Sequence, residues 1–351
     1  MMENLKISVN LIFGIIIALL FVEILLRIFN AVPLLDKFLV PDDYLIYHLK
    51  PNLNDKVQNA DGLYHDVKTI DLGFKDIGFR DDGINGEPFS VVLGDSFSAA
   101  FEVNMTDSWP QLLEEKLGKD VANMALYGYG SLQEKRMLEK YGVKLKPKLI
   151  LWEFFGNDFS DDFNAFNTLN NKETLFEKIY KEFRVVRFAW NNLAKIRRLS
   201  DSVFYNDDKL NIILWPNQWR NLYPITPDST AVQVGEKITK VNILEAKSIA
   251  ESNGAKFILI LFPNKDQVYW QFIKDKVKTI TLEELNYPVE EIKKFCTENN
   301  IVCLDLTPKL IELSSNEEQI YFTRDGHFNE KGNSVVADVI YKYLIENNLA
   351  S

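Results

Sequence analysis

The segment FSVVLGDSFSAAF places a serine where it could act as a nucleophile. Its first five residues, Phe89–Leu93, have the length and β-branched content of a buried parallel strand, and a helix-forming run begins at Phe97. Ser96 lies in the turn between them, at the carboxyl edge of the sheet, where open α/β sheets bind their ligands. The backbone N–H groups of the new helix point to the same place and could stabilise an oxyanion. The alternative is that Asp95 or Ser96 simply caps the helix.

A nucleophilic serine needs a base and a group that orients the base, and the C-terminal segment RDGHFN contains both residue types. His327 supplies the imidazole, and Asp325 can accept a hydrogen bond from its Nδ1. The other two histidines, His48 and His65, lie in a polar, turn-rich segment. The alternative is that His327 is an ordinary surface residue near the last helix.

Two further residues could complete an oxyanion hole with the backbone N–H of Ser96. Gly128, in YGYG, lets the backbone approach a substrate closely, and Asn157 offers a side-chain amide. Each residue also fits an ordinary turn. Because each follows its own predicted strand, we expect Ser96, Gly128 and Asn157 to meet at one edge of the sheet.

Five apolar runs alternate with helical patterns, which predicts an α/β fold with a five-stranded parallel sheet and helices on both faces. Right-handed crossovers between the strands leave few possible topologies. The predicted strands are 89–93, 121–125, 148–155, 256–262 and 301–306, and the helical patterns are 109–117, 133–141, 241–252 and 289–299.

Residues 159–239 interrupt this alternation between the third and fourth strands. The segment is rich in aromatic residues and asparagine and contains a basic amphipathic piece, Lys178–Arg198. An insertion at the ligand-binding edge of a sheet is a candidate cap or lid. The alternative is a surface that faces a membrane or a protein partner.

The composition bears on partners and cofactors. The 351 residues carry a net charge of −10 and no Lys-rich or Arg-rich tract, which argues against nucleic-acid binding. Two cysteines, Cys296 and Cys303, are too few for a disulfide framework or a zinc site. We expect two separate buried thiols, although they could pair in an oxidising compartment. The sequence shows no metal-binding cluster and no phosphate-binding glycine loop, so we expect no metal and no cofactor.

Residues 9–29 are the most hydrophobic stretch and are about long enough to cross a bilayer as one helix. Glu23 and Arg27 lie one helical turn apart near its end, where they can pair. No convincing cleavage site follows, so we predict an uncleaved membrane anchor over residues 1–30, with a buried core helix as the alternative. From the N-terminal position of the anchor we hypothesise that the rest of the chain lies outside the cytoplasm, in the periplasm or on the cell surface.

Residues 31–88 are polar and rich in proline and glycine, and we predict an irregular or short β segment packed on the main domain, 89–351. Gly78-Phe79-Arg80-Asp81 stands out within this segment. Arg80 could bind a carboxylate near the sheet edge, but we expect a surface ion pair.

Four motifs in this order resemble the SGNH/GDSL hydrolase superfamily: Gly94-Asp95-Ser96, Asn123 with Gly128, Gly156-Asn157-Asp158, and Asp325 with His327. The resemblance covers roughly 89–158 and 256–349, and GFRD resembles a segment that precedes the first motif in membrane-anchored bacterial members. It implies a flavodoxin-like three-layer α/β/α sandwich, with Ser96 as nucleophile, His327 as base, and Gly128 and Asn157 as oxyanion donors.

One position departs from the superfamily pattern. The superfamily usually has its aspartate three residues before the histidine, where this chain has Arg324. Asp325, two residues before His327, is the nearest acid, and we take it as the orienting group.

Serine–histidine chemistry with an oxyanion hole transfers an acyl group through an acyl-enzyme. The resemblance to carbohydrate O-acetylesterases favours a serine esterase acting on O-acyl, above all O-acetyl, esters of a carbohydrate or cell-envelope polysaccharide. The first alternative is an O-acetyltransferase that moves an acetyl group to a polysaccharide hydroxyl, similar to the alginate-type enzymes. The second is a catalytically silent glycan-binding or assembly module.

Overall fold

The computed structural model describes residues 2–32, 37–170, 174–200, 202–221 and 224–350. The chain forms two compact units. The smaller unit comprises Met1–Leu39 and Asn171–Ser200, and the larger comprises Val40–Asn170 and Asp201–Ser351. Each unit is described below by itself.

The larger unit is built on a five-stranded sheet with the order β11-β10-β7-β5-β6, in which all neighbours are parallel. In chain order this is 2-1-3-4-5, the flavodoxin-like arrangement, so the predicted fold class is confirmed. Val92, for example, pairs with Leu151 on one side and with Asn123 on the other. The strands are β5 (Ser90–Leu93), β6 (Val121–Asn123), β7 (Leu149–Phe155), β10 (Lys256–Phe262) and β11 (Val302–Asp305).

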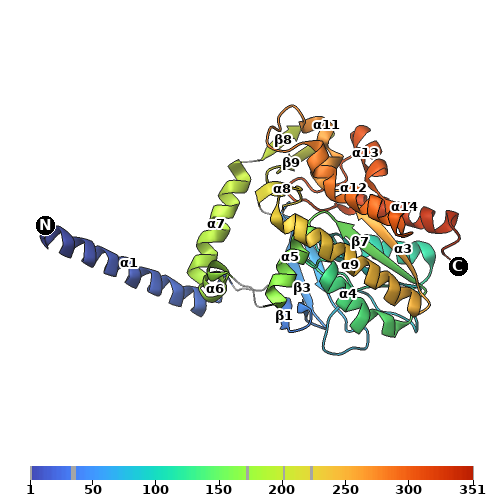
Figure 1. The fold of residues 1–351 in the computed structure, drawn as a ribbon, viewed down its shortest axis with the longest axis horizontal. Helices are drawn as coiled ribbons and strands as arrows, with labels where there is room; N and C mark the ends of the chain where they lie inside the picture. The colour runs from blue at the N-terminus through green and yellow to red at the C-terminus, as the bar shows by residue number, and fades with distance from the viewer. Residues whose placement is uncertain (1, 33–36, 171–173, 201, 222–223, 351) are drawn as a thin grey trace. The chain divides into compact units, whose positions relative to one another are not determined.

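Helices cover both faces of the sheet, because successive strand residues point to opposite sides and both sides are apolar. Val92, Leu151 and Ile260 pack in one cluster with residues of α3 (Trp109–Leu117) and α14 (Glu330–Glu346). A second group of helices lies side by side (Figure 1) and consists of α4 (Ser131–Lys140), α5 (Asp158–Leu169) and α9 (Thr230–Ser252). The remaining helices of the larger unit are α2 (Ser96–Ala99), α8 (Gln218–Asn221), α10 (Lys265–Val268), α11 (Trp270–Ile273), α12 (Leu282–Glu298) and α13 (Thr307–Ser315), with 3-10 turns η1 (Met105–Asp107) and η2 (Gly142–Leu145).

Short two-stranded sheets account for the polar segment before the main sheet and for part of the insertion. Two of these sheets lie within residues 31–88. The pairs are β1 (Leu39–Asp42) with β2 (Ile46–Leu49), β3 (Asn54–Gln58) with β4 (Tyr64–Lys68), and β8 (Val203–Asn206) with β9 (Asn211–Leu214).

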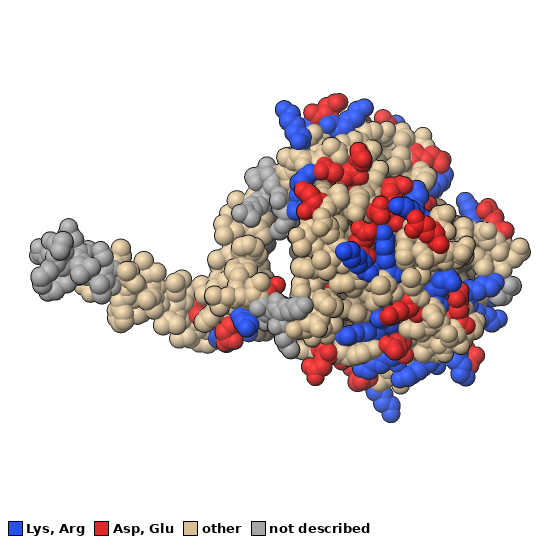
Figure 2. All heavy atoms as spheres, viewed as in Figure 1, with Lys and Arg blue, Asp and Glu red and all other residues tan. Residues whose placement is uncertain are grey.

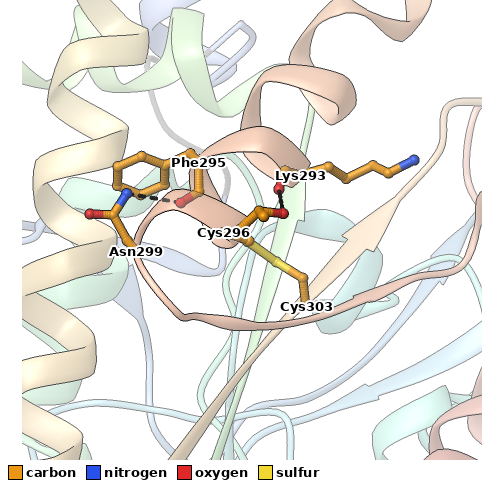
Figure 3. Close-up of a disulfide and its surroundings, with 6 residues drawn as sticks. Lys293, Phe295, Cys296, Asn299 and Cys303 are labelled. Atoms are coloured by element: carbon orange, nitrogen blue, oxygen red, sulfur yellow. Dashed lines mark hydrogen bonds between the residues drawn. A yellow bond between two sulfur atoms is a disulfide. The ribbon is translucent and has the colours of Figure 1, made fainter.

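Two expectations about the last crossover are wrong. Helix α12 begins seven residues earlier than predicted and contains Pro288, because Thr281 and Glu284 form a capping box that starts the helix upstream of the proline. Cys296 and Cys303 are not separate thiols but form a disulfide that joins α12 to β11 (Figure 3). The chain reverses between the helix and the strand, which brings the two Cα atoms to 6.4 Å, within the range that a disulfide requires.

The smaller unit contains α1 (Met2–Ile28), α6 (Leu175–Glu182) and α7 (Arg184–Ser200). Residues Asn10–Ile28 of α1 are long and apolar enough to cross a membrane. Their apolar side chains are exposed, which argues against a buried core helix. In Figure 2 the part of α1 that is not drawn in grey shows charged atoms only near its C-terminal end. There Arg27 Nε donates to Glu23 Oε1 at 2.7 Å, which confirms the predicted pair.

Candidate active site

Ser96 is the first residue of α2 and lies at the carboxyl end of β5, directly after the turn that ends this strand. Asp95 caps α2, because its carboxylate accepts a hydrogen bond from the Phe97 N–H at 2.9 Å. The Ser96 side chain takes no part in the cap and instead contacts His327. The capping alternative therefore describes Asp95 and not Ser96.

A buried carboxyl group stabilises the turn before Ser96 through hydrogen bonds to backbone N–H groups. Glu153 Oε2, from β7, accepts the backbone N–H of Asp95 at 3.2 Å and that of Ser98 at 3.0 Å. Gly94 makes room for it, since a Cβ at this position would lie 2.2 Å from the same oxygen. Together with the Asp95 cap, these bonds use the N–H groups on both sides of Ser96 but not the Ser96 N–H itself. Sequence analysis missed Glu153, although a charged residue within the apolar run KLILWEFF was a signal.

The structure brings Ser96, His327 and Asp325 together. Ser96 Oγ lies 2.7 Å from His327 Nε2, and His327 Nδ1 lies 2.5 Å from Asp325 Oδ1. With Nδ1–H donating to the carboxylate, Nε2 is the nitrogen that can accept the serine proton. Phe97 packs against the imidazole with ring centroids 4.9 Å apart, which fixes the plane of the ring.

Asp325, and not residue 324, faces the imidazole. The side chain of Arg324 is exposed, and its backbone N–H donates to Asp61 Oδ1 at 2.6 Å. Asp325 Oδ1 also accepts the His327 backbone N–H at 2.9 Å, so one oxygen binds both groups of the same residue. Although burial opposes ionisation, His327 lowers the pKa of Asp325 to about 2.

A buried lysine fixes the loop that carries Asp325 and His327. Lys265 Nζ donates to the carbonyls of Ile213, Phe322, Thr323 and Asp325, at 2.6–3.1 Å. Burial lowers the pKa of Lys265 to about 8. Sequence analysis missed this residue. Its position three residues after the end of β10 was the available signal, because polar residues after parallel strands gather at one edge of the sheet.

A second carboxylate, Glu102, lies beside the imidazole and was also missed. Its Oε1 is 3.5 Å from His327 Nδ1, and its buried Oε2 has no hydrogen-bond partner among the described residues. Burial opposes the charged imidazolium, but Glu102 and Asp325 together outweigh this effect and raise the pKa of His327 above its ordinary value of 6.5. Glu102 follows Ser96 by six residues, and no strand or motif marks it in the sequence.

We expect Glu102→Gln to shift the acid limb of the pH profile of kcat/KM to lower pH. The imidazole must be unprotonated to accept the Ser96 proton, so activity rises with pH through the pKa of His327. Loss of one neighbouring carboxylate lowers this pKa, and we expect a shift of about one pH unit. Complete pH profiles measure it, with Glu115→Gln on the exposed side of α3 as the control. Superimposable profiles for wild type and Glu102→Gln would show that Glu102 does not act on His327.

Glu102, Asp325 and His327 are also the one group among the described residues whose metal-ligating atoms lie within 4.8 Å of one another. A cation there would compete for the imidazole nitrogen that Asp325 already engages. The arrangement therefore suits an Nδ1–H that donates to a carboxylate better than a metal ligand.

The two predicted oxyanion donors lie in loops on either side of Ser96, because β5 lies between β6 and β7 in the sheet. Gly128 has φ +73°, and a Cβ there would lie 2.9 Å from Tyr47 Oη, which donates to the Gly128 carbonyl at 3.0 Å. Asn157 Nδ2 donates one hydrogen bond to Asp161 Oδ2 at 2.7 Å, which leaves its second N–H for another acceptor.

We expect Asn157→Ala to reduce kcat about 10²-fold with a smaller effect on KM, the signature of a donor that acts on the developing oxyanion. Steady-state kinetics with an activated ester measure both constants. Asn170→Ala, at the C-terminal end of the same helix, is the control. A loss confined to KM would show that Asn157 binds substrate without stabilising the oxyanion.

Three buried acidic side chains lie behind the turn that carries Ser96. Glu134, Glu153 and Asp158 are each 1% exposed, and both carboxyl oxygens of Glu134 lack a hydrogen-bond partner among the described residues. Burial, with repulsion from neighbouring carboxylates, raises the pKa of all three well above the usual range. The folded protein therefore holds protons that the unfolded chain releases near pH ~4.

We expect the protein to be more stable at about pH 5 than at about pH 8. Above the unfolded pKa the unfolded chain binds fewer protons than the native state, so stability falls as pH rises toward the raised native values. His327 acts in the same direction, because its contribution is complete below pH 6.5 and is lost as pH rises through its raised pKa. Melting temperatures should drop by about 5 °C or more between these pH values. Glu134→Gln should reduce this drop and Glu298→Gln, on the surface, should not; equal drops would contradict the assignment.

Arg80 does not form the expected surface ion pair. It is 1% exposed, and its guanidinium donates to the carbonyls of Ala99, Ala100 and Val103, at the end of α2 and just beyond it. The expectation failed because an exposed arginine is the common case, whereas here the segment after α2 ends in unpaired carbonyls that need a donor. Arg80 therefore positions the segment that carries Glu102.

No protein-family model matches this chain, and no curated protein matches it. Solved structures that it resembles include a putative lipolytic protein of the G-D-S-L family from Desulfitobacterium hafniense, with 14% identity, a TM-score of 0.42, and coverage of 72% of this chain and 98% of that one. A lipase/acylhydrolase from Enterococcus faecalis shares 12% identity with a TM-score of 0.40 over 74% of this chain and 96% of that one. An acetyl xylan esterase shares 15% identity with a TM-score of 0.42 over 73% and 99%. The chain is thus similar to GDSL-type lipolytic proteins and acylhydrolases over about three quarters of its length. At these sequence identities and TM-scores, the similarity assigns no function to the chain.

Proposed function

We propose that this chain is a serine esterase of the SGNH/GDSL type, with Ser96 as nucleophile, His327 as general base and Asp325 as the acid that orients the base. The proposal is carried by the continuous hydrogen-bond chain from Ser96 Oγ through both ring nitrogens of His327 to Asp325 Oδ1. A serine that only caps a helix needs no such chain, whereas a nucleophile does.

In the proposed first half-reaction, Ser96 Oγ attacks the ester carbonyl carbon while its proton passes to Nε2 of His327. Negative charge then develops on the carbonyl oxygen, where the Ser96 N–H, Gly128 and Asn157 would stabilise it. Collapse of this intermediate expels the alcohol, which takes the proton from Nε2 and leaves the acyl group on Ser96. Water then gives a proton to His327 and attacks the acyl carbon. As the bond between the acyl carbon and Ser96 Oγ breaks, His327 returns the proton to Oγ, which releases the carboxylic acid and restores the serine.

We propose O-acetyl esters of a carbohydrate as the substrate. Two aromatic side chains support this choice, because apolar faces of sugar rings pack on accessible aromatic rings. The ring of Tyr127 is half-exposed, and its centroid lies 6.2 Å from the imidazole of His327. The ring centroid of Trp215, from the insertion, lies 5.6 Å from Lys265 Nζ. The same Nζ donates a hydrogen bond to the Asp325 carbonyl.

A panel of O-acetylated polysaccharides tests this substrate, with the de-acetylated polymers as controls. The full chain should release acetate from at least one polymer, and the Ser96→Ala variant should release none. Acetyl groups that appear on a second glycan would identify an O-acetyltransferase. Binding to a polymer with neither reaction would identify a non-catalytic glycan-binding module.

We also propose that α1 anchors the protein in a membrane, with the larger unit outside the cytoplasm. The exposed apolar surface of α1 supports the anchor, and the Cys296–Cys303 disulfide supports an oxidising compartment. Protease added to intact spheroplasts should degrade the larger unit, and complete protection would reverse the orientation. Recovery of a membrane-free chain that lacks residues 1–30 would instead identify α1 as a cleaved signal sequence.

A further inference from the structure

Glu23, the acidic residue within the apolar part of α1, links that helix to a segment 162 residues further along the chain. Its carboxylate is buried and accepts two hydrogen bonds, from Arg27 Nε at 2.7 Å and from the backbone N–H of Val185 at 2.8 Å. Val185 lies in the first turn of α7, where N–H groups have no partner within the helix. The charge that interrupts the apolar stretch therefore caps α7.

Two arginines of α7 reinforce this attachment. Arg184 Nη1 donates to the carbonyls of Leu26 and Ala31 at 3.0 and 3.2 Å, and Arg187 Nε donates to the Val32 carbonyl at 2.9 Å. In return, Arg27 Nη2 donates to the Glu182 carbonyl at the end of α6, at 2.7 Å. The hairpin α6–α7, Leu175–Ser200, is thus bonded to the end of the apolar helix through both of its helices.

The position of Glu23 sets the depth of this hairpin. The apolar segment Asn10–Ile28 has 19 residues and extends over about 28 Å, close to the hydrocarbon thickness of a bilayer. Glu23 lies five residues, or about 7.5 Å, before the end of this segment. The first turn of α7 is therefore bonded to the part of α1 that lies near the end of the apolar segment, where the helix approaches the headgroups.

The hairpin exposes several large apolar side chains, and the sequence of α7 is strongly basic. Phe176 packs against Trp190 with ring centroids 4.9 Å apart, which joins the apolar surfaces of the two helices. The sequence of α7 contains five Lys and Arg residues and no acid, in a chain whose net charge is −10. The exposed large apolar side chains of the hairpin are Leu175, Phe176, Ile179, Phe183, Phe188, Trp190, Leu193 and Ile196.

We propose that the α6–α7 hairpin lies in the surface of an anionic phospholipid bilayer, on the side where α1 leaves it. The proposal rests on the proposed membrane anchor. Helices with exposed Trp, Phe and Leu side chains and many basic residues bind at the headgroup boundary, where anionic lipids attract the charges. Continuity with the exposed apolar surface of α1 favours lipid over a protein partner, because the hairpin is bonded to the residues that emerge from the bilayer.

Quenching of Trp190 by brominated lipids tests the proposal in the full chain. Wild type and Trp190→Phe are reconstituted in vesicles of phosphatidylcholine and phosphatidylglycerol, with bromine either near the headgroup end or near the far end of the acyl chains. We expect the Trp190 signal, obtained as the difference between the two proteins, to be quenched mainly by the shallow bromine. Trp270→Phe, in the larger unit, should leave the quenched signal unchanged.

Carbonate extraction of the same vesicles separates the two ways in which this could fail. A chain that resists extraction but whose Trp190 is not quenched would overturn the hairpin proposal and leave the anchor intact. Release of the chain by carbonate would overturn the anchor itself. Equal quenching with and without phosphatidylglycerol would overturn the assignment to an anionic surface.

Discussion

Ser96→Ala is expected to lower kcat/KM for an activated acetyl ester by about 10³-fold or more, because it removes the atom that forms the acyl-enzyme. The hydroxyl lies 2.7 Å from His327 Nε2, and alanine has no atom that can replace it. Stopped assays with a chromogenic acetyl ester measure the loss. Since Ser96 does not cap α2, the variant should keep its melting temperature, which distinguishes a chemical defect from a folding defect.

Ser252→Ala, at an exposed serine at the end of α9, is the matched control and should behave as wild type. Comparable activity in Ser96→Ala and wild type would remove Ser96 from the reaction. A large loss accompanied by a much lower melting temperature would show that the hydroxyl serves the fold.

Asp325→Ala is expected to lower kcat/KM by about 10³-fold, whereas Arg324→Ala should have little effect. Asp325 holds Nδ1–H of the imidazole and so directs Nε2 toward Ser96. The side chain at position 324, where the superfamily usually has its aspartate, is exposed. The same ester assay applied to both variants measures the difference.

A full loss in Arg324→Ala with wild-type activity in Asp325→Ala would place the orienting acid elsewhere. Glu102 would then be the first candidate, because its carboxylate is 3.5 Å from the same ring nitrogen. The double variant Asp325→Ala with Glu102→Gln should be less active than either single variant if both carboxylates support the imidazole.

The sheet could be predicted from the sequence because its strands are continuous apolar runs. Strands buried on both faces must be apolar at every position, and a run such as KFILILF has few other interpretations. Right-handed crossovers then leave few possible strand orders, and the flavodoxin-like order was implied by the resemblance to the SGNH/GDSL superfamily. The placement of Ser96, Gly128 and Asn157 along one edge follows in turn, because each residue comes directly after such a run.

Residues whose role depends on a distant partner could not be predicted. Arg80 binds carbonyls 19 or more residues away, and Lys265 binds carbonyls more than 50 residues away. These distances along the chain follow neither the helical nor the strand period, so the sequence does not show which carbonyls the two residues bind. Only the short distance between Glu102 and His327 distinguishes this residue, and that distance exists only in the folded protein.

The start of α12 and the state of the two cysteines were also predicted wrongly. The helical pattern was predicted only over 289–299, whereas the capping box at Thr281 starts α12 upstream of Pro288. A spacing of seven residues does not show that the chain reverses between the two cysteines. The sequence therefore did not predict that they come close enough to form a disulfide. The catalytic roles and the domain limits 1–30, 31–88 and 159–239 stay predictions, although the smaller unit takes only Asn171–Ser200 from the insertion.

The most direct test of the account is covalent labelling with a fluorophosphonate, followed by peptide mapping. The account predicts one adduct, on Ser96, formed rapidly in wild type and much more slowly in His327→Ala, because the imidazole must take the serine proton. An adduct on another residue, or equal labelling rates in wild type and His327→Ala, would contradict it.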